Sequence, residues 1–561
     1  MLDKYLFDSI LIRLYRGIIV NSFFKITVFA LVDIISSCSL PNVKLGEITD
    51  FYSNEKSEAF NNFSTNVDVD KINSYFDTLF DLVAKNSSYA SADMTFVNNF
   101  NDLIGSFYKV MDGITINRAK YFDTADGEYK KAYLDYYDTY LEILNKYHDL
   151  LEDCYHSNYR EPLFGNMSDQ EIEEMIASYK TSEEEKRYTL AFEELSNDAE
   201  EIYSKDYQSS NYEDEMFELL VKYIGTAKDY ASYLNVDYLN HIYKTDYDRN
   251  YTTKEALSFY EAIKTELVPA ANTYKTKLDN IKLNSSEQKF INLLETYNFR
   301  YYQTDILPAI EDYVYSIEPL SKAYRNLWST NGIYCFSDND DSLGTAFTSY
   351  MRTKNQPILF FSKNYQEAYT FLHEFGHYTS YYCSEGARFP MDISEMDSQG
   401  NELIFTSYLQ DNYEKYEISQ NVVDYLGCSK VYSQLTSIVN CAYVSEMEQI
   451  AYNYDLTDKD GFFRKINEVC NSYGTIARKK YWWAPALCNF GYYISYATSS
   501  IGALQFYISS RSDYESAVNK YSKFIKRTNS SWTIDEITDS VGLLQIYSDD
   551  AVKYIAEYLK K

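Results

Sequence analysis

The pattern of apolar and polar positions predicts a mainly α-helical chain. Two stretches, "VDKINSYFDTLFDLVAKN" (Val69–Asn86) and "YKKAYLDYYDTYLEILNKYHDLLEDCYH" (Tyr129–His156), place apolar residues at i, i+3, i+4 and i+7, the spacing of one helix face. The acidic stretch Thr181–Leu220 keeps this spacing, so we expect helices with acidic outer faces there. The chain has only 8 prolines and 18 glycines, which favours long helices joined by short polar turns.

One segment departs from the helical period. Between Ser337 and Phe361 a turn-rich acidic loop is followed by "TAFTSYM", a polar turn and "PILFF", which together predict a small β-hairpin. The helical pattern resumes near Tyr365. An extended peptide can add as a further strand to the edge of such a hairpin.

The N-terminal segment "SILIRLYRGIIVNSFFKITVFALVDIISSCSLP" (Ser9–Pro41) is apolar, but charged residues keep every run below the roughly 18 residues of a membrane-spanning helix. Its short apolar core, Ile26–Ile35, leads into "ISSC", which resembles the end of a bacterial lipoprotein signal, where the cysteine is lipidated. We therefore expect export and attachment to the membrane at a bacterial cell surface through Cys38. The alternative is an amphipathic N-terminal helix of a cytoplasmic protein.

Composition excludes one class of partner and says little about others. The 83 acidic residues outnumber the 52 basic ones and give a net charge of −31, which argues against nucleic acid as a partner. The eight cysteines form no CxxC pair, so we expect free thiols packed as small apolar residues.

The segment "FLHEFGHYTSYY" (Phe371–Tyr382) carries the strongest chemical signal, because it holds two of only five histidines. On a helix, His373 and His377 lie one turn apart on the same face and can bind one metal ion. Glu374 lies on the adjacent flank, where its carboxylate can reach a water on that metal without being a ligand. This HExxH pattern is typical of zinc metalloproteases, and we predict one Zn²⁺ per chain.

A catalytic zinc ion needs a third protein ligand. The remaining histidines lie far upstream, so an acidic ligand is expected in "MDISEMDSQGNELIF" (Met391–Phe405). There, Glu395 and Glu402 are seven residues apart on one helix face, and Asp392 and Asp397 are competitors. We predict Glu395 as the ligand and Glu402 as the hydrogen-bond acceptor that fixes the tautomer of a ligand histidine.

Gly376 lies inside the predicted metal-site helix, where a glycine costs about 1 kcal/mol relative to alanine. We expect it to allow the helix that bears Glu395 to approach closely.

These residues resemble the thimet oligopeptidase and oligoendopeptidase F metallopeptidases. The resemblance rests on "HEFGH", on "EMDSQGNE" (Glu395–Glu402) and on "GTAFTSY" with "PILFF" upstream. It implies a large two-lobed helical shell around a deep substrate channel, a small β-hairpin or sheet next to the zinc helix, and short unstructured oligopeptides as substrates.

The same resemblance implies tyrosines that stabilise the tetrahedral intermediate. The matching region, "WWAPALCNFGYYISYATSSIG", offers Tyr492 and Tyr496 one turn apart, with Tyr493 as an alternative. The family usually has a histidine shortly before these tyrosines, where this chain has Ala486 or Cys488.

The predicted function is zinc-dependent endopeptidase activity. Glu374 would activate the water, and Tyr492 and Tyr496 would donate to the developing oxyanion. One alternative is a zinc aminopeptidase, although no "GxMEN" segment is present to bind a free amine. A second is a surface lipoprotein that captures peptides with weak or no catalysis, which the missing histidine motivates.

The predicted organisation has three parts. Residues 1–40 form the apolar N-terminal segment, 41–205 an N-terminal helical lobe, and 206–561 the catalytic helical region with the zinc site. We place the boundary near "SKDYQSSNYEDE" (Ser204–Glu215).

Overall fold

The structure, a computed structural model, describes residues 56–560 apart from 64–65, 86–88, 166, 178, 180–181 and 297–305. The predicted lipoprotein signal with Cys38 lies outside the described residues. The cysteines within them form no disulfide, as predicted. Among the described helices, none is both long enough and apolar enough to cross a membrane.

The chain divides into two compact units. The first holds the described residues up to Lys186 together with Leu327–Lys363, and the second holds Arg187–Asn326 and the residues from Asn364 onward. The boundary predicted at residues 205 and 206 falls at the end of the helix Glu183–Asp206, within the second unit, and that division stays a prediction.

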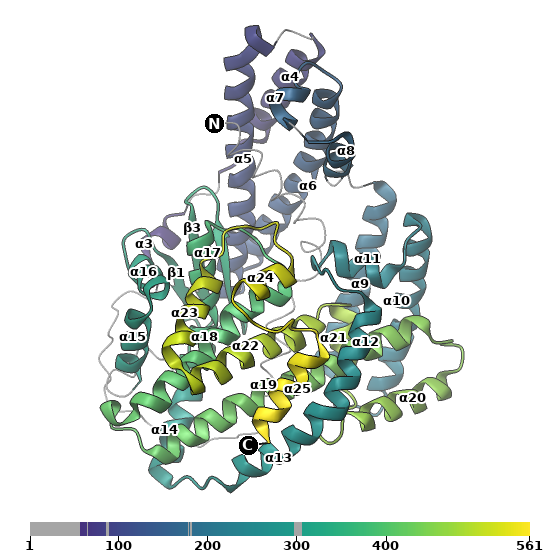
Figure 1. The fold of residues 1–561 in the computed structure, drawn as a ribbon. Coiled ribbons are helices and arrows are strands. Elements are labelled where there is room, and N and C mark those ends of the chain that lie inside the picture. Colours follow the sequence, from purple (N-terminus) through teal and green to yellow (C-terminus); the bar gives the residue numbers. More distant parts are fainter. Residues whose placement is uncertain are drawn as a thin grey trace. The chain divides into compact units, whose positions relative to one another are not determined.

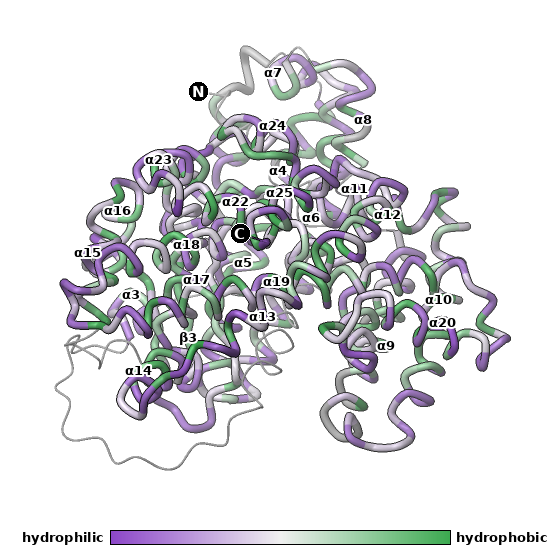
Figure 2. The backbone as a smooth tube through the Cα atoms, turned by 60° about the horizontal axis from the view of Figure 1, so that its bottom comes forward, coloured by the Kyte–Doolittle hydropathy of each residue, from purple (hydrophilic) through white to green (hydrophobic). Residues whose placement is uncertain are grey.

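The first unit combines helices with a small sheet (Figure 1). Its helices are α3 (Glu58–Asn61), α4 (Val69–Ala84), α5 (Tyr89–Thr124), α6 (Gly127–Tyr155), α7 (Arg160–Phe164) and α8 (Asp169–Ala177), and the unit ends within α9 (Glu183–Asp206). Hydrophobic and hydrophilic residues alternate along these helices (Figure 2), because each buries one face.

The sheet contains the predicted hairpin and one further strand. Strands β2 (Ala346–Met351) and β3 (Gln356–Phe361) pair antiparallel, with Ala346 opposite Phe361, which confirms the hairpin. Strand β1 (Ile333–Phe336), which was not predicted, pairs parallel with β3 and gives the order β1-β3-β2.

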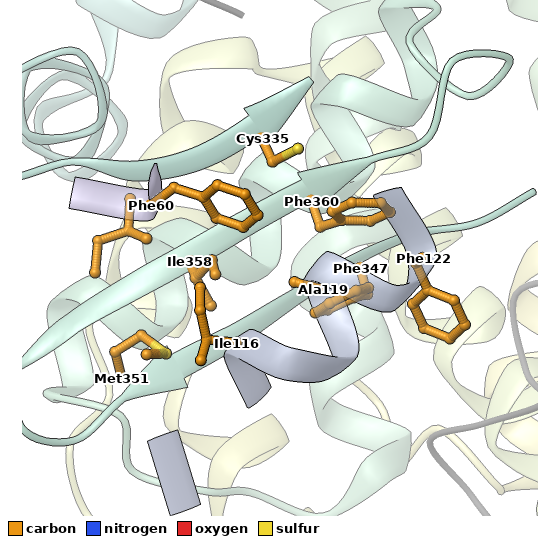
Figure 3. Packing of buried hydrophobic residues seen from close by; sticks show 10 residues of the cluster. Phe60, Ile116, Ala119, Phe122, Cys335, Phe347, Met351, Ile358 and Phe360 are labelled. Carbon is orange, nitrogen blue, oxygen red and sulfur yellow. The ribbon is translucent and has the colours of Figure 1, made fainter. Parts of the chain in front are cut away.

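One face of this sheet is covered by α5 and α3 (Figure 3). Ile116, Ala119 and Phe122 of α5 join Phe60 of α3 in one apolar cluster with strand residues. The strand side chains of the cluster are Ile333, Cys335, Phe347, Met351, Ile358 and Phe360. The helices and the strands bury these apolar side chains against each other, and this burial stabilises the first unit.

The second unit is entirely helical within the described residues. After α9 it contains α10 (Tyr212–Leu234), α11 (Tyr238–Thr245), α12 (Thr253–Ala262), the π-helical turn η1 (Ile263–Leu267), α13 (Val268–Asn280), α14 (Ser285–Thr296), α15 (Leu307–Ser316), α16 (Glu318–Leu327), α17 (Ala368–Ser384), α18 (Met391–Asn412), the 3₁₀ turn η3 (Tyr413–Tyr416), α19 (Gln420–Asn453), α20 (Lys459–Ser472), α21 (Trp483–Cys488), α22 (Ile494–Ser512), α23 (Tyr514–Ile525), α24 (Ile534–Ser540) and α25 (Asp549–Leu559). The fold is therefore mainly α with a small sheet, as predicted. The expected channel between two lobes stays a prediction.

Helix α18 lies at the centre of the second unit, in contact with α17, α19 and α22 (Figure 1). Its closest approach to α17 is at Gly376, where an added Cβ would lie 2.5 Å from the Asp397 carbonyl oxygen and 2.8 Å from the Ser398 Cα. Asn401 strengthens the contact, because its Nδ2 donates to the Leu372 carbonyl at 2.7 Å. The predicted role of Gly376 in close helix packing is confirmed.

We predict that Gly376→Ala destabilises the chain by about 1–3 kcal/mol, because backbone atoms of α18 cannot yield to the new methyl group without separating the helices. The steric cost of the methyl group exceeds the gain of about 1 kcal/mol in helix propensity that alanine brings over glycine. Urea denaturation measures the difference. The matched control is Gly225→Ala in α10, where an added Cβ meets nothing within 4 Å and a stabilisation of about 0.5–1 kcal/mol is expected. A Gly376→Ala chain as stable as wild type would contradict the account of this contact.

Candidate metal centre

Two histidines on α17 and one glutamate on α18 converge. His373 and His377 lie one turn apart, with ring centroids separated by 5.2 Å. The Oε2 atom of Glu395 is 3.7 Å from His373 Nε2 and 3.8 Å from His377 Nε2. One ligand atom from each residue lies within 4.8 Å of the other two, so the three side chains can hold one metal ion.

The environment of Glu395 distinguishes its two oxygens. Its Oε1 accepts a hydrogen bond from the Tyr492 hydroxyl at 3.2 Å. Its Oε2 is buried and receives no hydrogen bond from the described residues. An unsatisfied buried polar atom costs about 1–3 kcal/mol. The orphaned oxygen faces the two imidazoles, which is where a cation would satisfy it.

Glu402, about two turns further along α18, contacts the first histidine. Its Oε1 lies 2.8 Å from His373 Nδ1, and the other ring nitrogen of His373, Nε2, faces Glu395. The second oxygen of Glu402 lies 3.8 Å from Lys430 Nζ of α19, and this ammonium also lies over the Tyr369 ring, 3.4 Å from its centroid. The structure thus places Glu402 beside a predicted ligand histidine, together with a cation that the prediction did not include, and its role in fixing the tautomer stays a prediction.

The two competing acids on α18 are bound elsewhere. Asp392 accepts from Arg249 Nε at 3.0 Å and from the Tyr251 hydroxyl at 2.7 Å. Asp397 forms a two-pronged ion pair with Arg527, with N–O distances of 2.6 and 2.7 Å. The oxygens of Asp392 and Asp397 are occupied by these donors, whereas Glu395 has an oxygen that faces both histidines.

Burial and neighbouring charges shift the pKa values of these groups. Burial lowers the pKa of His373, but the hydrogen bond to Glu402 and the surrounding carboxylates outweigh it and raise the pKa to about 9. Burial, followed by the charge on His373, lowers the pKa of His377 well below its usual range. Burial raises the pKa of the Glu395 carboxyl to about 7, while the charge on His373 opposes the rise.

Glu374 is buried on α17, and its charge acts on the other members of the site. It contributes to the raised pKa values of His373, Glu395 and Tyr496. The predicted base is therefore electrostatically part of the same cluster as the predicted ligands.

The tyrosines at the start of α22 and just before it occupy different environments. Tyr492 is buried against Glu395, whereas Tyr496 is partly exposed and shares a hydrogen bond with Tyr492. Tyr493, the alternative, is completely buried, and its hydroxyl has no hydrogen-bond partner among the described residues. Ala486 and Cys488, near the position of the family histidine, are also buried. Of these tyrosines, Tyr496 is the one that solvent reaches.

Four residues that support the site were not predicted: Asn401, Arg249, Arg527 and Lys430. Asn401 lies inside the quoted "EMDSQGNE" segment, so its position in the motif was a usable signal. The two arginines and the lysine lie in other helices or loops, and no local pattern in the sequence marks them.

The chain matches no protein-family model, and it matches no curated protein sequence.

The fold, in contrast, is similar to that of solved peptidase structures. A structure described as PZ peptidase A with an inhibitor matches with a TM-score of 0.63 and 15% identity, over 89% of this chain and 99% of that chain. A putative oligoendopeptidase F matches with a TM-score of 0.64 and 15% identity, over 89% of this chain and 98% of that one. A putative oligoendopeptidase F from Bacillus anthracis matches with a TM-score of 0.63 and 14% identity, over 91% of this chain and 98% of that one. The resemblance noted in the sequence is thereby confirmed for the fold: this chain has the fold of the oligoendopeptidase F and PZ peptidase structures.

Proposed function

We propose that this chain is a zinc-dependent endopeptidase that hydrolyses short unstructured oligopeptides. The observation that carries the proposal is the convergence of His373 Nε2, His377 Nε2 and Glu395 Oε2, the last of which is buried without a hydrogen-bond donor. Two imidazoles and one carboxylate are a ligand set of catalytic zinc sites, which keep a fourth position open. The residues therefore fit the ion that the HExxH pattern predicts.

When bound, zinc supplies a Lewis acid that polarises the scissile carbonyl and makes a water molecule more acidic. Glu374 accepts the proton of that water and delivers it to the leaving amine, which is general base and then general acid catalysis. Its position beside His373 on α17, and its electrostatic influence on Glu395 and Tyr496, support this role.

The remaining polar groups orient the ligands. Glu402 holds His373 Nδ1, which leaves Nε2 with its lone pair toward the metal. Tyr492 holds the Oε1 atom of Glu395 and leaves Oε2 for the metal. Each ligand-orienting hydrogen bond of this kind contributes to metal affinity.

Tyr496 is the candidate donor to the oxyanion. Burial, followed by the charge of Glu395, raises its pKa well above the usual value, so its hydroxyl stays protonated and can donate at neutral pH. Tyr492 already donates to Glu395, and we therefore assign it to holding the ligand, with Tyr496 as the group that contacts the substrate.

The substrate class rests on the likeness of the fold to oligoendopeptidase F and PZ peptidase structures. The two alternatives differ in what they do to a peptide. An aminopeptidase requires a free amino terminus, and a peptide-capturing surface lipoprotein binds a peptide without efficient cleavage. A peptide with a blocked amino terminus separates the three functions.

We predict that the wild-type chain cleaves an N-terminally blocked, internally quenched oligopeptide, that a chelator abolishes cleavage, and that added Zn²⁺ restores it. The Glu374→Gln chain is expected to retain one Zn²⁺ and to lose at least about 10²-fold in kcat, because the amide cannot accept the proton. Fluorescence gives turnover and elemental analysis of the same sample gives zinc content.

Glu385→Gln is the matched control for this experiment. Glu385 lies just after the same helix, is exposed, and should leave kcat unchanged. Cleavage of free but not of blocked peptides would favour the aminopeptidase, and peptide binding without turnover would favour the capture protein. Full activity of Glu374→Gln would overturn the assignment of the base.

We predict that Tyr496→Phe lowers kcat by about 10²–10³-fold while zinc affinity stays unchanged, because one donor to the oxyanion is lost. Tyr492→Phe should instead weaken zinc binding by about 10–100-fold, because Glu395 loses the hydrogen bond that orients it. Competition with a chelating dye measures affinity, and quenched-peptide turnover at saturating zinc measures kcat. If Tyr492→Phe instead lowers kcat and Tyr496→Phe weakens zinc binding, the roles assigned to the two tyrosines must be exchanged.

A further inference from the structure

Arg249 is a buried arginine in the loop between α11 and α12 of the second unit (Figure 1). Its side chain and that of Asp392 on α18 are both 0% exposed. A buried charge is costly unless it is paired and its hydrogen-bonding capacity is used. The donors of Arg249 are therefore expected to be fully engaged, and their partners indicate what the residue holds in place.

The guanidinium joins two parts of the site. Its Nε donates to Asp392 Oδ2 at 3.0 Å, which lies on the helix that carries Glu395. Its Nη1 donates to the Gly491 carbonyl at 2.7 Å. Its Nη2 donates to the Ser495 hydroxyl at 2.6 Å and more weakly, at 3.4 Å, to the Tyr492 carbonyl. We refer to Arg249, Asp392, Gly491, Tyr492 and Ser495 as the Arg249 network.

Asp392 closes this network from the α18 side. Besides Arg249 it accepts from Ser495 Oγ at 3.0 Å and from Thr498 Oγ1 at 2.6 Å, both on α22. Asp392 precedes Glu395 by three residues, so the two side chains lie on the same face of α18. Fixing Asp392 against α22 therefore fixes the part of α18 from which Glu395 projects.

The backbone around Tyr492 is also restrained by other groups: the Glu448 carboxylate accepts from the Gly491 N–H, and the Ser495 N–H donates to the Tyr492 carbonyl at 2.9 Å. Gly491 has φ of +80°, a conformation that glycine adopts readily. The rings of Tyr243 and Tyr247 flank the guanidinium at 4.6 and 4.5 Å, and the Tyr247 hydroxyl donates to the Phe490 carbonyl at 3.0 Å. Tyr247 thus restrains the Phe490 carbonyl and Arg249 restrains the Gly491 carbonyl, the two carbonyls that directly precede Tyr492.

We propose that Arg249 is a positioning residue of the metal site: by tying Gly491, Tyr492 and Ser495 to Asp392, it keeps the Tyr492 hydroxyl on Glu395 and orients Glu395 toward the metal. The inference rests on the proposed function, because Glu395 needs this orientation only if it is a ligand. Arg249 touches neither the ligand atoms nor the substrate position, and acts through Tyr492.

The test uses the full chain with Arg249→Lys, which keeps the charge but replaces the three nitrogens of the guanidinium by one, so that it cannot hold Asp392, Gly491 and Ser495 in their present geometry. A second variant, Arg249→Met with Asp392→Asn, removes both charges together, so that no unpaired buried charge prevents folding. Hydrogen exchange of the amides between residues 486 and 500 reports on the turn, and competition with a chelating dye reports Zn²⁺ affinity.

We expect at least about 10-fold faster exchange around Tyr492 in both variants, and a loss of about 10–100-fold in Zn²⁺ affinity, the range for removing a group that orients a ligand. In a Tyr492→Phe background, Arg249→Lys should cause no further loss of Zn²⁺ affinity, because residues that act through one another are not additive. Tyr473→Phe is the control: it removes the hydrogen bond from the buried Tyr473 to Glu446 and should change neither measurement at the turn.

Two outcomes overturn the inference alone. Unchanged Zn²⁺ affinity in both Arg249 variants, with wild-type zinc binding intact, makes Arg249 a purely structural residue. If Arg249→Lys lowers Zn²⁺ affinity by the same factor in the wild-type and Tyr492→Phe backgrounds, Arg249 does not act through Tyr492. A wild-type chain that takes up no zinc is a different result, because it overturns the proposed function and the metal-positioning role with it, whatever the exchange rates are.

Discussion

The close contact between α17 and α18 is the constraint on which the site depends. With a glycine at position 376, the backbones meet without a side chain between them, and Asn401 adds a hydrogen bond to the Leu372 carbonyl. At this separation, side chains from the two helices reach one another directly: His373 contacts both Glu395 and Glu402. A wider spacing would move the carboxylates of α18 away from the imidazoles of α17 and lengthen these contacts.

The second organising feature is the distribution of partners among the acids of α18. Four carboxylates project from one helix into a buried region of a strongly acidic chain, and like charges in such surroundings require compensation. Each has a different partner. The pairs are Asp392 with Arg249, Asp397 with Arg527, Glu402 with His373 and Lys430, and Glu395 with Tyr492 at one oxygen only. Glu395 is therefore distinguished as the proposed ligand as much by the cations that pair with the other acids as by its own position.

The sequence supports some of these conclusions better than others. Spacings of three, four and seven residues are local, so the helix with His373 and His377 and the shared face of Glu395 and Glu402 could be predicted. Spacing does not tell which acid is free, because Arg249 and Arg527 lie 143 and 130 residues from their carboxylates.

The same limit applies to the fold. The hairpin carries turn signals on both sides, whereas strand β1 is a run of four residues that fits a helix as well as a strand. The tyrosines gave no selective pattern, since 61 of them are spread along the chain. Only their burial separates Tyr493 in the core from the partly exposed Tyr496.

The donor for Glu395 comes from far along the chain. Tyr492 lies 97 residues after Glu395, and Arg249 lies 243 residues before the Tyr492 carbonyl that it binds. During synthesis, the helices bearing both histidines and the glutamate leave the ribosome well before α22 is made. A growing chain therefore holds His373, His377 and Glu395, the proposed metal ligands, before Tyr492, the donor to Glu395, is made. Completion of the proposed site is then coupled to completion of the polypeptide, and a truncated product that ends before Tyr492 would retain the HExxH helix without the hydrogen bond to Glu395.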